Sequence, residues 1–404
     1  MIKVHTKESL PTLVVKTLFL AGPTLRQPTT EVSWRTEALQ ILQELGFDGH
    51  VFTPEYRDGA DIDVQTDEGY SEQCEWEEKA LNQADIVVFW VPRDLKKLPA
   101  FTTNIEFGAW CESGKVVFGY PKDCPNPEKN RYLEHYARKY NVPVAYSLKE
   151  TLQNALSKIG EGALRRNGEA KVPLYIYNHP TFQSWLESQR KNGNELVDAK
   201  VLWNFRPKHS DFVFCFALHV DVFIEAENRH KVNEFILART DISSIVMFYH
   251  PEETLATIEE LLDTKVVFVK EFRSPARTQD SFITEIPGGS ASKKLPPAMV
   301  IVHELEEETS FKLDASRLVE IGSRQLAGTF SAHNSHLFGT RITREEYKYF
   351  RNLANSGMTF GVQGESEMTY VVVMDVREML ASKRVDWSNI GMIFQALMSL
   401  KKPD

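Results

Sequence analysis

The sequence predicts two folded regions: an N-terminal α/β domain built on a doubly wound parallel sheet with flanking helices, and a C-terminal α+β region with a mixed sheet. Over residues 14–164, apolar strand-like runs alternate with segments of helical spacing, which is typical of parallel sheets with helical crossovers. Beyond residue 196, strand-like runs follow one another with fewer helices between them. A chain of 404 residues also exceeds the usual size of a single core.

The N-terminal elements follow from apolar runs and from leucines or acidic residues at helical spacing. We expect strands at Val14–Ala21, Val51–Pro54, Asp85–Val91 and Lys115–Tyr120, and helices at Ser33–Leu45, Ser71–Asn82, Asn104–Ser113 and Ser147–Leu164. The third strand is apolar after its first residue, as expected of a strand that is covered on both faces.

The second half has a different character, and we predict domains at 1–160 and 196–404, joined by a polar linker and a connecting helix over 161–195. Expected strands are Ala199–Phe205, Asp211–Ala226, Phe235–Ala238, Ser244–His250 and Lys265–Phe272. Expected helices are Pro180–Gly193, Pro251–Leu262, Ala298–Thr309, Thr343–Ala354 and Trp387–Leu400.

Composition excludes several classes of function. The net charge of -9 disfavours binding to nucleic acid polymers or membrane surfaces, whose phosphates would repel the protein. The longest N-terminal apolar run is interrupted by Lys16 and is too short to span a bilayer. The four cysteines form no CxxC pair, which is typical of reduced thiols, so we expect a cytoplasmic protein. A small anionic substrate is compatible if metal ions or local Arg and Lys residues offset the charge.

The clearest motif of the C-terminal half is an acidic helix. Glu304, Glu307 and Glu308 lie at positions i, i+3 and i+4, so they share one helix face. Three neighbouring carboxylates repel one another unless a cation binds, and oxygen ligands of this kind suit Mg²⁺ or Mn²⁺. Bound metal can polarise a diphosphate and activate water. A solvated acidic face is the alternative.

This segment resembles the Nudix box. Gly289 stands at the required distance before His303–Phe311, and the metal-binding glutamates of the family fall on the three residues named above. The chain departs from the box at Leu295, His303 and Ser310, where the family has Glu, Arg and Gly. The resemblance implies an α/β/α sandwich with a mixed sheet and metal-dependent hydrolysis of a nucleoside diphosphate derivative.

The flanking residues are similar to those of ADP-ribose pyrophosphatases within that family. The resemblance implies that Arg273 contacts substrate phosphate, and it includes the lead-in residue Glu285 in the binding site together with Gly289. A downstream loop would supply a general base, for which Glu365 and Glu367 are the candidates.

In the N-terminal half, polar and aromatic residues gather at predicted strand ends, where ligands bind in parallel sheets. The candidate substrate-binding residues are Gly22, Pro23, Arg26, Trp34, Arg35, Trp90, Arg93, Phe101 and Asn104. Glu106, near a helix N-terminus, could attack a sugar carbon in an N-glycosidic bond. Asp85 or Asp94 could hydrogen-bond the base, and Trp90 and Phe101 could stack on it. Trp34 and Trp90 could equally be core residues, and the arginines could be surface charges.

Residues 16 to 155 resemble the nucleoside 2-deoxyribosyltransferase-like family. The matching segments include Phe19–Pro23, Phe52–Glu55, Glu75–Glu77, Phe89–Arg93 and Thr102–Gly108. The resemblance implies that Glu106 is the nucleophile, that Asp85 assists at the base, and that the protein is a homo-oligomer. Ala100 stands where better-studied transferases have an Asp, which leaves base handling and transfer versus hydrolysis open.

Two functions fit these observations. The first is an enzyme with two activities on nucleoside or nucleotide substrates: N-glycosidic cleavage or deoxyribosyl transfer, and metal-dependent diphosphate hydrolysis. The second is a glycosidase or transferase regulated by a non-catalytic, nucleotide-sensing Nudix domain, which the departures from the box allow. A scaffold of two inactive enzyme folds is a third reading. The fusion itself says little about function.

Overall fold

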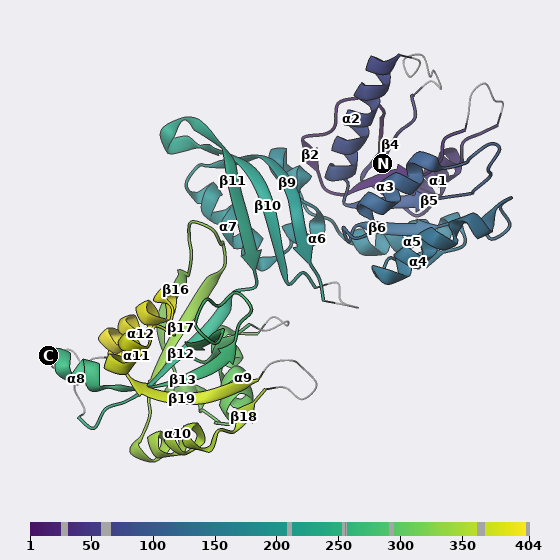
Figure 1. Ribbon diagram of the computed structural model, residues 1–404. Coiled ribbons are helices and arrows are strands. Elements are labelled where there is room, and N and C mark those ends of the chain that lie inside the picture. The colour runs from purple at the N-terminus through teal and green to yellow at the C-terminus, as the bar shows by residue number, and fades with distance from the viewer. Residues whose placement is uncertain are drawn as a thin grey trace. The chain divides into compact units, whose positions relative to one another are not determined.

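The computed structural model describes residues 1–25, 31–57, 66–207, 212–252, 255, 257–290, 295–361 and 368–400. The chain forms two compact units, Met1–Leu237 and Ala238–Asp404 (Figure 1). The sequence-based division placed residues 196–237 with the C-terminal domain, whereas contacts within the structure group them with the first unit.

A six-stranded parallel sheet forms the centre of the first unit. Its strands, in spatial order, are β1 (Ile2–His5), β4 (His50–Thr53), β3 (Thr17–Ala21), β5 (Ile86–Trp90), β6 (Val116–Gly119) and β7 (Val144–Ala145). β3 pairs with β4 on one side and with β5 on the other. The chain therefore reverses its winding direction between β3 and β5, and ligands collect at such a point, beyond the carboxyl ends of the strands.

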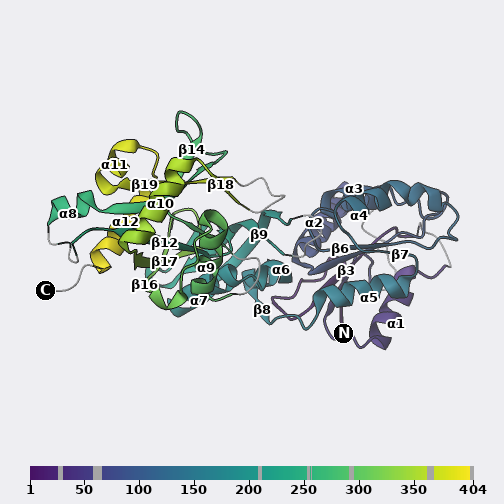
Figure 2. The same cartoon turned by 90° about the horizontal axis from the view of Figure 1, so that it is seen from below.

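Helices cover both faces of this sheet, as predicted (Figure 2). One face carries α1 (Trp34–Glu44) and α5 (Leu148–Ile159), which pack on Leu18 and Leu20. The other carries α2 (Asp67–Gln83), α3 (Phe101–Trp110) and α4 (Arg131–Lys139), which pack around Phe19 and Phe89. A 3-10 helix, η1 (Pro127–Asn130), leads into α4.

The segment predicted as a linker is packed against the rest of the first unit. β8 (Arg165–Arg166) pairs with β2 (Leu13–Val14). It is followed by η2 (Asn167–Lys171), α6 (Leu174–Tyr177) and α7 (Pro180–Lys191). A three-stranded antiparallel sheet of β9 (Glu195–Phe205), β10 (Cys215–Ile224) and β11 (Arg229–Arg239) then packs on η2 and α7, with η3 (Glu225–Glu227) between β10 and β11. These contacts explain why β9, β10 and β11 belong to this unit.

The second unit is built on a mixed eight-stranded sheet. The main path is β16 (Val319–Gln325), β17 (Asn334–Arg341), β12 (Ile242–Tyr249), β13 (Lys265–Phe272), β19 (Thr369–Asp375) and β18 (Thr359–Phe360). β14 (Phe282–Glu285) pairs with β13, and β15 (Gly288–Gly289) pairs with β12. β12 and β17 run parallel, whereas the other pairs are antiparallel.

Helices again lie on both faces, which gives the second unit an α/β/α architecture (Figure 1). One face carries α8 (Ile258–Asp263), α11 (Val376–Ser382) and α12 (Trp387–Leu400). The opposite face carries α9 (Pro297–Thr309) and α10 (Arg344–Ser356), with η4 (Ala315–Arg317) after α9. A mixed sheet was predicted for this region, and the structure has one.

Most predicted elements are present, with shifted ends. The sequence missed β1 and the amphipathic α4, and it extended α8 too far towards the N-terminus. The helix predicted from residue 251 begins at Ile258, where Thr257 and Glu260 form a capping box. Within the described part of the chain, no helix is both long enough and apolar enough to cross a bilayer.

Candidate active site

A pocket of about 360 Å³ lies at the carboxyl end of β3 in the first unit. Its walls come from the end of β3, from α2 and from the amino end of α3. The lining residues are Phe19, Ala21, Gly22, Pro23, Thr24, Pro54, Tyr70, Gln73, Cys74, Glu77, Pro99, Ala100, Phe101, Thr102 and Glu106. Four of the predicted site residues, Gly22, Pro23, Phe101 and Glu106, are therefore brought together.

Two carboxyl groups face each other in this pocket. Burial and the neighbouring charge of Glu77 raise the pKa of Glu106 to about 7. Burial also raises the pKa of Glu77, against the hydrogen bond from Gln73 and the positive charge of Arg35. The two side chains are close enough to share a hydrogen bond. Because two adjacent carboxylates resist full ionisation, the pair holds one proton near neutral pH.

Glu77 was absent from the predicted site, although it stood in a segment that matched the family. Tyr70, Gln73, Cys74 and Glu77 all line the pocket from α2. Their spacing of i, i+3, i+4 and i+7 is that of one helix face. The buried Trp76 anchors the helix, since its ring packs in the core and its Nε1 donates to the carbonyl of Glu8 at 2.7 Å. This periodicity is the sequence signal that could have identified Glu77.

Arg35 shapes the pocket from below its surface. It is fully buried, and it donates to the carbonyls of Leu20 and Gly22 at 3.0 and 2.6 Å and to Glu55 at 2.7 Å. Arg35 therefore fixes the loop after β3. It was predicted to bind substrate, but it does not line the pocket. Gly22 has a φ of +149°, and a Cβ there would lie 2.3 Å from the carbonyl oxygen of Trp90. Only glycine fits this close approach.

Arg93 has a similar supporting position at the next strand end. Its buried guanidinium donates to Asn130 at 2.7 Å, to the carbonyl of Pro99 at 2.8 Å and to Asn104 at 2.7 Å. Arg93 and Asn104 thus brace the amino end of α3, which carries Glu106. Asp94 accepts from the backbone of Lys96 at 2.8 Å, so it stabilises a turn and does not line the pocket.

The structure places Asp85 at the amino end of β5, away from the pocket. Its carboxylate binds both Nη atoms of Arg165 at 2.7 Å and accepts from the backbone N–H and the hydroxyl of Thr17 at 2.8 Å. Both members of this ion pair are fully buried. Asp85 precedes β5, whereas the pocket lies beyond the other end of the parallel strands. This placement makes Asp85 a structural residue and disfavours the predicted role at the base.

The aromatic residues predicted to contact the substrate do not all lie at the pocket. Trp90 belongs to the core between the sheet and helices α1 and α5, on the face away from Glu106. Trp34 packs beside Gly22 and donates to the carbonyl of Pro23 at 3.0 Å, which supports the loop. Phe101 lines the pocket and is 66% exposed, so its ring is available for stacking. Arg26 lies outside the described residues.

Residues 15–124 match the family described as nucleoside 2-deoxyribosyltransferase like. The matched segment contains the whole pocket lining, including Glu77 and Glu106. A search of curated proteins found no match. The family match does not extend to the second unit, for which the Nudix resemblance remains a prediction.

In the second unit, part of the predicted acidic cluster converges on β15. A Cβ on Gly289 would lie 2.3 Å from the carboxyl carbon of Glu304, so the two residues are in close contact. Glu308 accepts from the backbone N–H of Gly288 at 3.2 Å. Burial and the charge of Glu304 raise the pKa of Glu308 well above its usual range. Glu307 is exposed, although the sequence grouped it with the other two.

The other predicted residues of this region have varied positions. Arg273 donates to Glu285 at 2.9 and 2.6 Å and also pairs with Glu271 at 2.9 Å, so its charge is balanced within the protein. Glu285 contributes to the electrostatic environment of Glu308. Glu365 and Glu367 lie outside the described residues.

The described residues contain no group of three or more His, Cys, Asp or Glu side chains arranged to hold a metal ion. Mg²⁺ commonly binds through one or two carboxylates and takes its other ligands from water and phosphate. Glu304 and Glu308, held against β15 with one raised pKa, fit that mode. The prediction of Mg²⁺ or Mn²⁺ stays a prediction.

Proposed function

We propose that the first unit cleaves the N-glycosidic bond of a nucleoside or nucleotide, with Glu106 as nucleophile and Glu77 as proton donor. The observation that carries the proposal is the proton-sharing carboxyl pair in a pocket at the carboxyl end of β3. The family match to a transferase-like group points in the same direction.

The proposed chemistry uses both carboxyl groups. In the resting pair the raised pKa of Glu106 keeps the shared proton on that residue, so the proton first moves to Glu77 across their hydrogen bond. The ionised Glu106 then attacks the anomeric carbon, the bond from that carbon to the base nitrogen breaks, and the base takes the proton from Glu77. The resulting glycosyl ester passes the sugar to water or to a second base. Phe101, which is exposed at the pocket rim, would stack on the departing base. Glu77 thereby takes the role that sequence analysis gave to Asp85.

The test is release of free base from a panel of ribo- and deoxyribonucleosides and their monophosphates, with and without an acceptor base. Wild-type protein should release base, whereas Glu106→Ala should not. Asp94→Asn is a suitable control because Asp94 stabilises a turn outside the pocket. Base release that survives Glu106→Ala would refute the nucleophile assignment.

We further propose, as a second activity, metal-dependent hydrolysis of a nucleoside diphosphate derivative by the second unit. The observation that favours it is the convergence of Glu304 and Glu308 on Gly288 and Gly289. A divalent cation held there would neutralise diphosphate charge when bound. These residues would bind and orient the cation, and the N–H of Gly288 holds Glu308 in place.

The experiment is incubation of the full chain with ADP-ribose and Mg²⁺ or Mn²⁺, with AMP as the product to be detected. Activity that Glu308→Gln abolishes supports the enzyme. Binding of ADP-ribose without turnover supports the alternative, in which a nucleotide-sensing second unit regulates the glycosidase. Absence of both binding and turnover refutes both proposals for this unit.

A further inference from the structure

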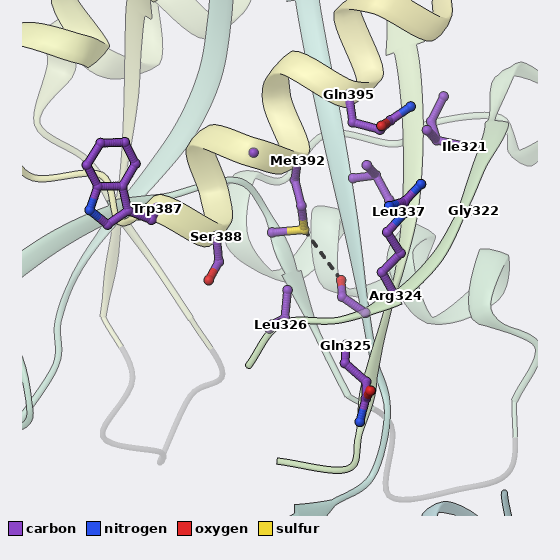
Figure 3. Close-up of a pocket in the computed structure, with 12 residues that line it drawn as sticks. Ile321, Gly322, Arg324, Gln325, Leu326, Leu337, Trp387, Ser388, Met392 and Gln395 are labelled. Carbon is purple, nitrogen blue, oxygen red and sulfur yellow. Dashed lines mark hydrogen bonds between the residues drawn. The ribbon is translucent and has the colours of Figure 1, made fainter. Parts of the chain in front are cut away.

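A second cleft in the C-terminal unit lies away from the acidic cluster. It has a volume of about 300 Å³ and is formed by β16, the first residues of β17 and α12. Figure 3 shows side chains from α12 facing those of the strands across it. Leu337 at its floor belongs to the core under α12, whereas the next residue, Phe338, belongs to the core under α9. The cleft and Glu304 therefore lie on opposite faces of the sheet.

Gly391 leaves an opening in this cleft. It lies in the interior of α12, where glycine costs about 1 kcal/mol relative to alanine. A Cβ at this position would meet no atom of the described chain within 4 Å. Packing among the described residues thus gives no reason for glycine here, and the absent side chain leaves room for a ligand. The register shift between Glu320 and Gly322 in β16 adds a bulge at the cleft wall, and bulges are over-represented beside functional sites.

The cleft also contains a cationic group with free hydrogen-bonding capacity. Arg324 is exposed on β16 and lines the cleft. Among the described residues, no hydrogen bond or ion pair to its guanidinium is found, whereas Arg317 in the same unit is paired with Glu346 at 2.6 Å. A guanidinium with its donors unused is suited to bind phosphate or carboxylate in bidentate fashion.

At the other end of the cleft is an aromatic ring. Trp387 begins α12 and is 86% exposed, which is unusual for so large an apolar side chain. The helix end itself is already capped, because the Asp386 carboxylate accepts from the backbone N–H of Asn389 at 2.7 Å. An anionic group in the cleft would therefore bind Arg324, and the exposed indole of Trp387 is available to stack on a flat ring. Ile321, Leu326, Leu337 and Met392 supply an apolar surface between the two.

We propose that this cleft binds a nucleoside monophosphate, with the base on Trp387 and the phosphate on Arg324. A flat heteroaromatic ring joined to an anion satisfies the exposed indole, the apolar floor and the unpaired guanidinium together. The volume is at the lower end of the range for small-molecule sites, which suits a mononucleotide better than a dinucleotide. The site is independent of either activity proposed above.

The test is photolabelling of the full chain with 8-azido-AMP, followed by peptide mapping, which separates this cleft from the pocket around Glu106. Label is expected in the tryptic peptide covering residues 385–401. Both AMP and adenosine should compete for it, AMP more strongly, and inorganic phosphate weakly. Competition by phosphate alone would contradict the base-stacking part of the proposal, and absence of label from this peptide would overturn the site.

Two variants locate the contacts. Arg324→Ala should raise the AMP concentration for half-maximal protection about ten-fold, because a charge-assisted contact is lost. Gly391→Leu should fill the opening and abolish labelling of this peptide. Arg344→Ala removes another exposed arginine, on α10, and should change nothing. Thermal melting checks that each variant is folded. Labelling of the peptide that is unchanged in both folded cleft variants would refute the proposal.

Discussion

The two units each contain a pair of glutamates in close proximity, and the pairs differ in how their charge is balanced. Glu77 and Glu106 lie in a pocket near the buried cation Arg35, which lowers both pKa values against the effect of burial. Glu304 and Glu308 lie against Gly288 and Gly289, and the nearby Arg273 is already paired with Glu285 and Glu271. The first pair can share a proton without an added ion, whereas a bound cation could balance the negative charge of the second pair.

The largest expected effect concerns the first pair. Glu106→Ala should lower base release by about 10³-fold or more, since the nucleophile is lost. Glu77→Gln should lower it by about 10²-fold with natural nucleosides. With p-nitrophenyl 2-deoxyriboside, whose leaving group needs no proton, the second variant should lose much less. Equal losses of Glu77→Gln on both substrates, measured as kcat/KM, would contradict the proton-donor role.

The second pair should respond to metal. In the wild-type chain, Mg²⁺ at about 100 times its Kd should stabilise the second unit by about 2.7 kcal/mol, which differential scanning calorimetry would detect as a higher Tm. Glu308→Gln should abolish that response and should raise the Tm without metal, because burial beside Glu304 makes an acidic side chain costly at this position. Glu306→Gln, on the same helix and paired with Lys312, is the matched control. A cation response in Glu308→Gln equal to that of the wild type would disprove the assignment.

The pH dependence of base release should separate the pairs further. The reaction needs one proton on the carboxyl pair, which Glu77 donates while Glu106 attacks, so kcat/KM should fall as the pH rises above about 7 and the pair loses that proton. Glu77→Gln removes both the proton donor and the charge that raises the pKa of Glu106, so the remaining activity should rise with pH, at a lower pKa than in the wild type, and then level off. The same raised pKa means that the folded state loses stability as pH rises from the ordinary glutamate range towards 7. A fall in kcat/KM above about pH 7 that persists in Glu77→Gln would show that the two groups are not coupled.

The smallest effect concerns backbone geometry beside the second pair. Ser310 ends α9 with a φ of +54°, in the left-handed region that favours glycine. Ser310→Gly should therefore stabilise the second unit by about 1 kcal/mol. Lys383→Gly, at the equivalent position after α11, should give a similar gain. A gain at Lys383 but not at Ser310, measured by thermal melting, would show that Ser310 makes a compensating contact.

Local sequence patterns pointed to one member of the first pair and to both members of the second. Glu106 could be predicted because it sits in a recognisable segment after a strand, and Glu304 and Glu308 because their spacing places them on one helix face. Asp85 was misjudged because its partner, Arg165, is 80 residues away in a segment that looked like a linker.

The remaining errors have the same origin. Trp90 lies near the predicted site in sequence, but alternate residues of a strand face opposite sides of the sheet, and Trp90 faces α1 and α5. Arg35 and Arg93 looked like surface or binding residues, whereas their acceptors are backbone carbonyls and side chains that only the folded loops bring together. Tertiary contacts of this kind cannot be read from local patterns.

A covalent intermediate on Glu106 can be detected by mass spectrometry of the intact protein after incubation with a 2-deoxy-2-fluoro nucleoside, which slows breakdown of a glycosyl ester. Attack by Glu106 predicts a protein heavier by one sugar residue, with the added mass located by peptide mapping on Glu106 and absent from Glu106→Gln. Adduct formation on another residue, or base release with no adduct and equal rates in wild type and Glu106→Gln, would contradict the account.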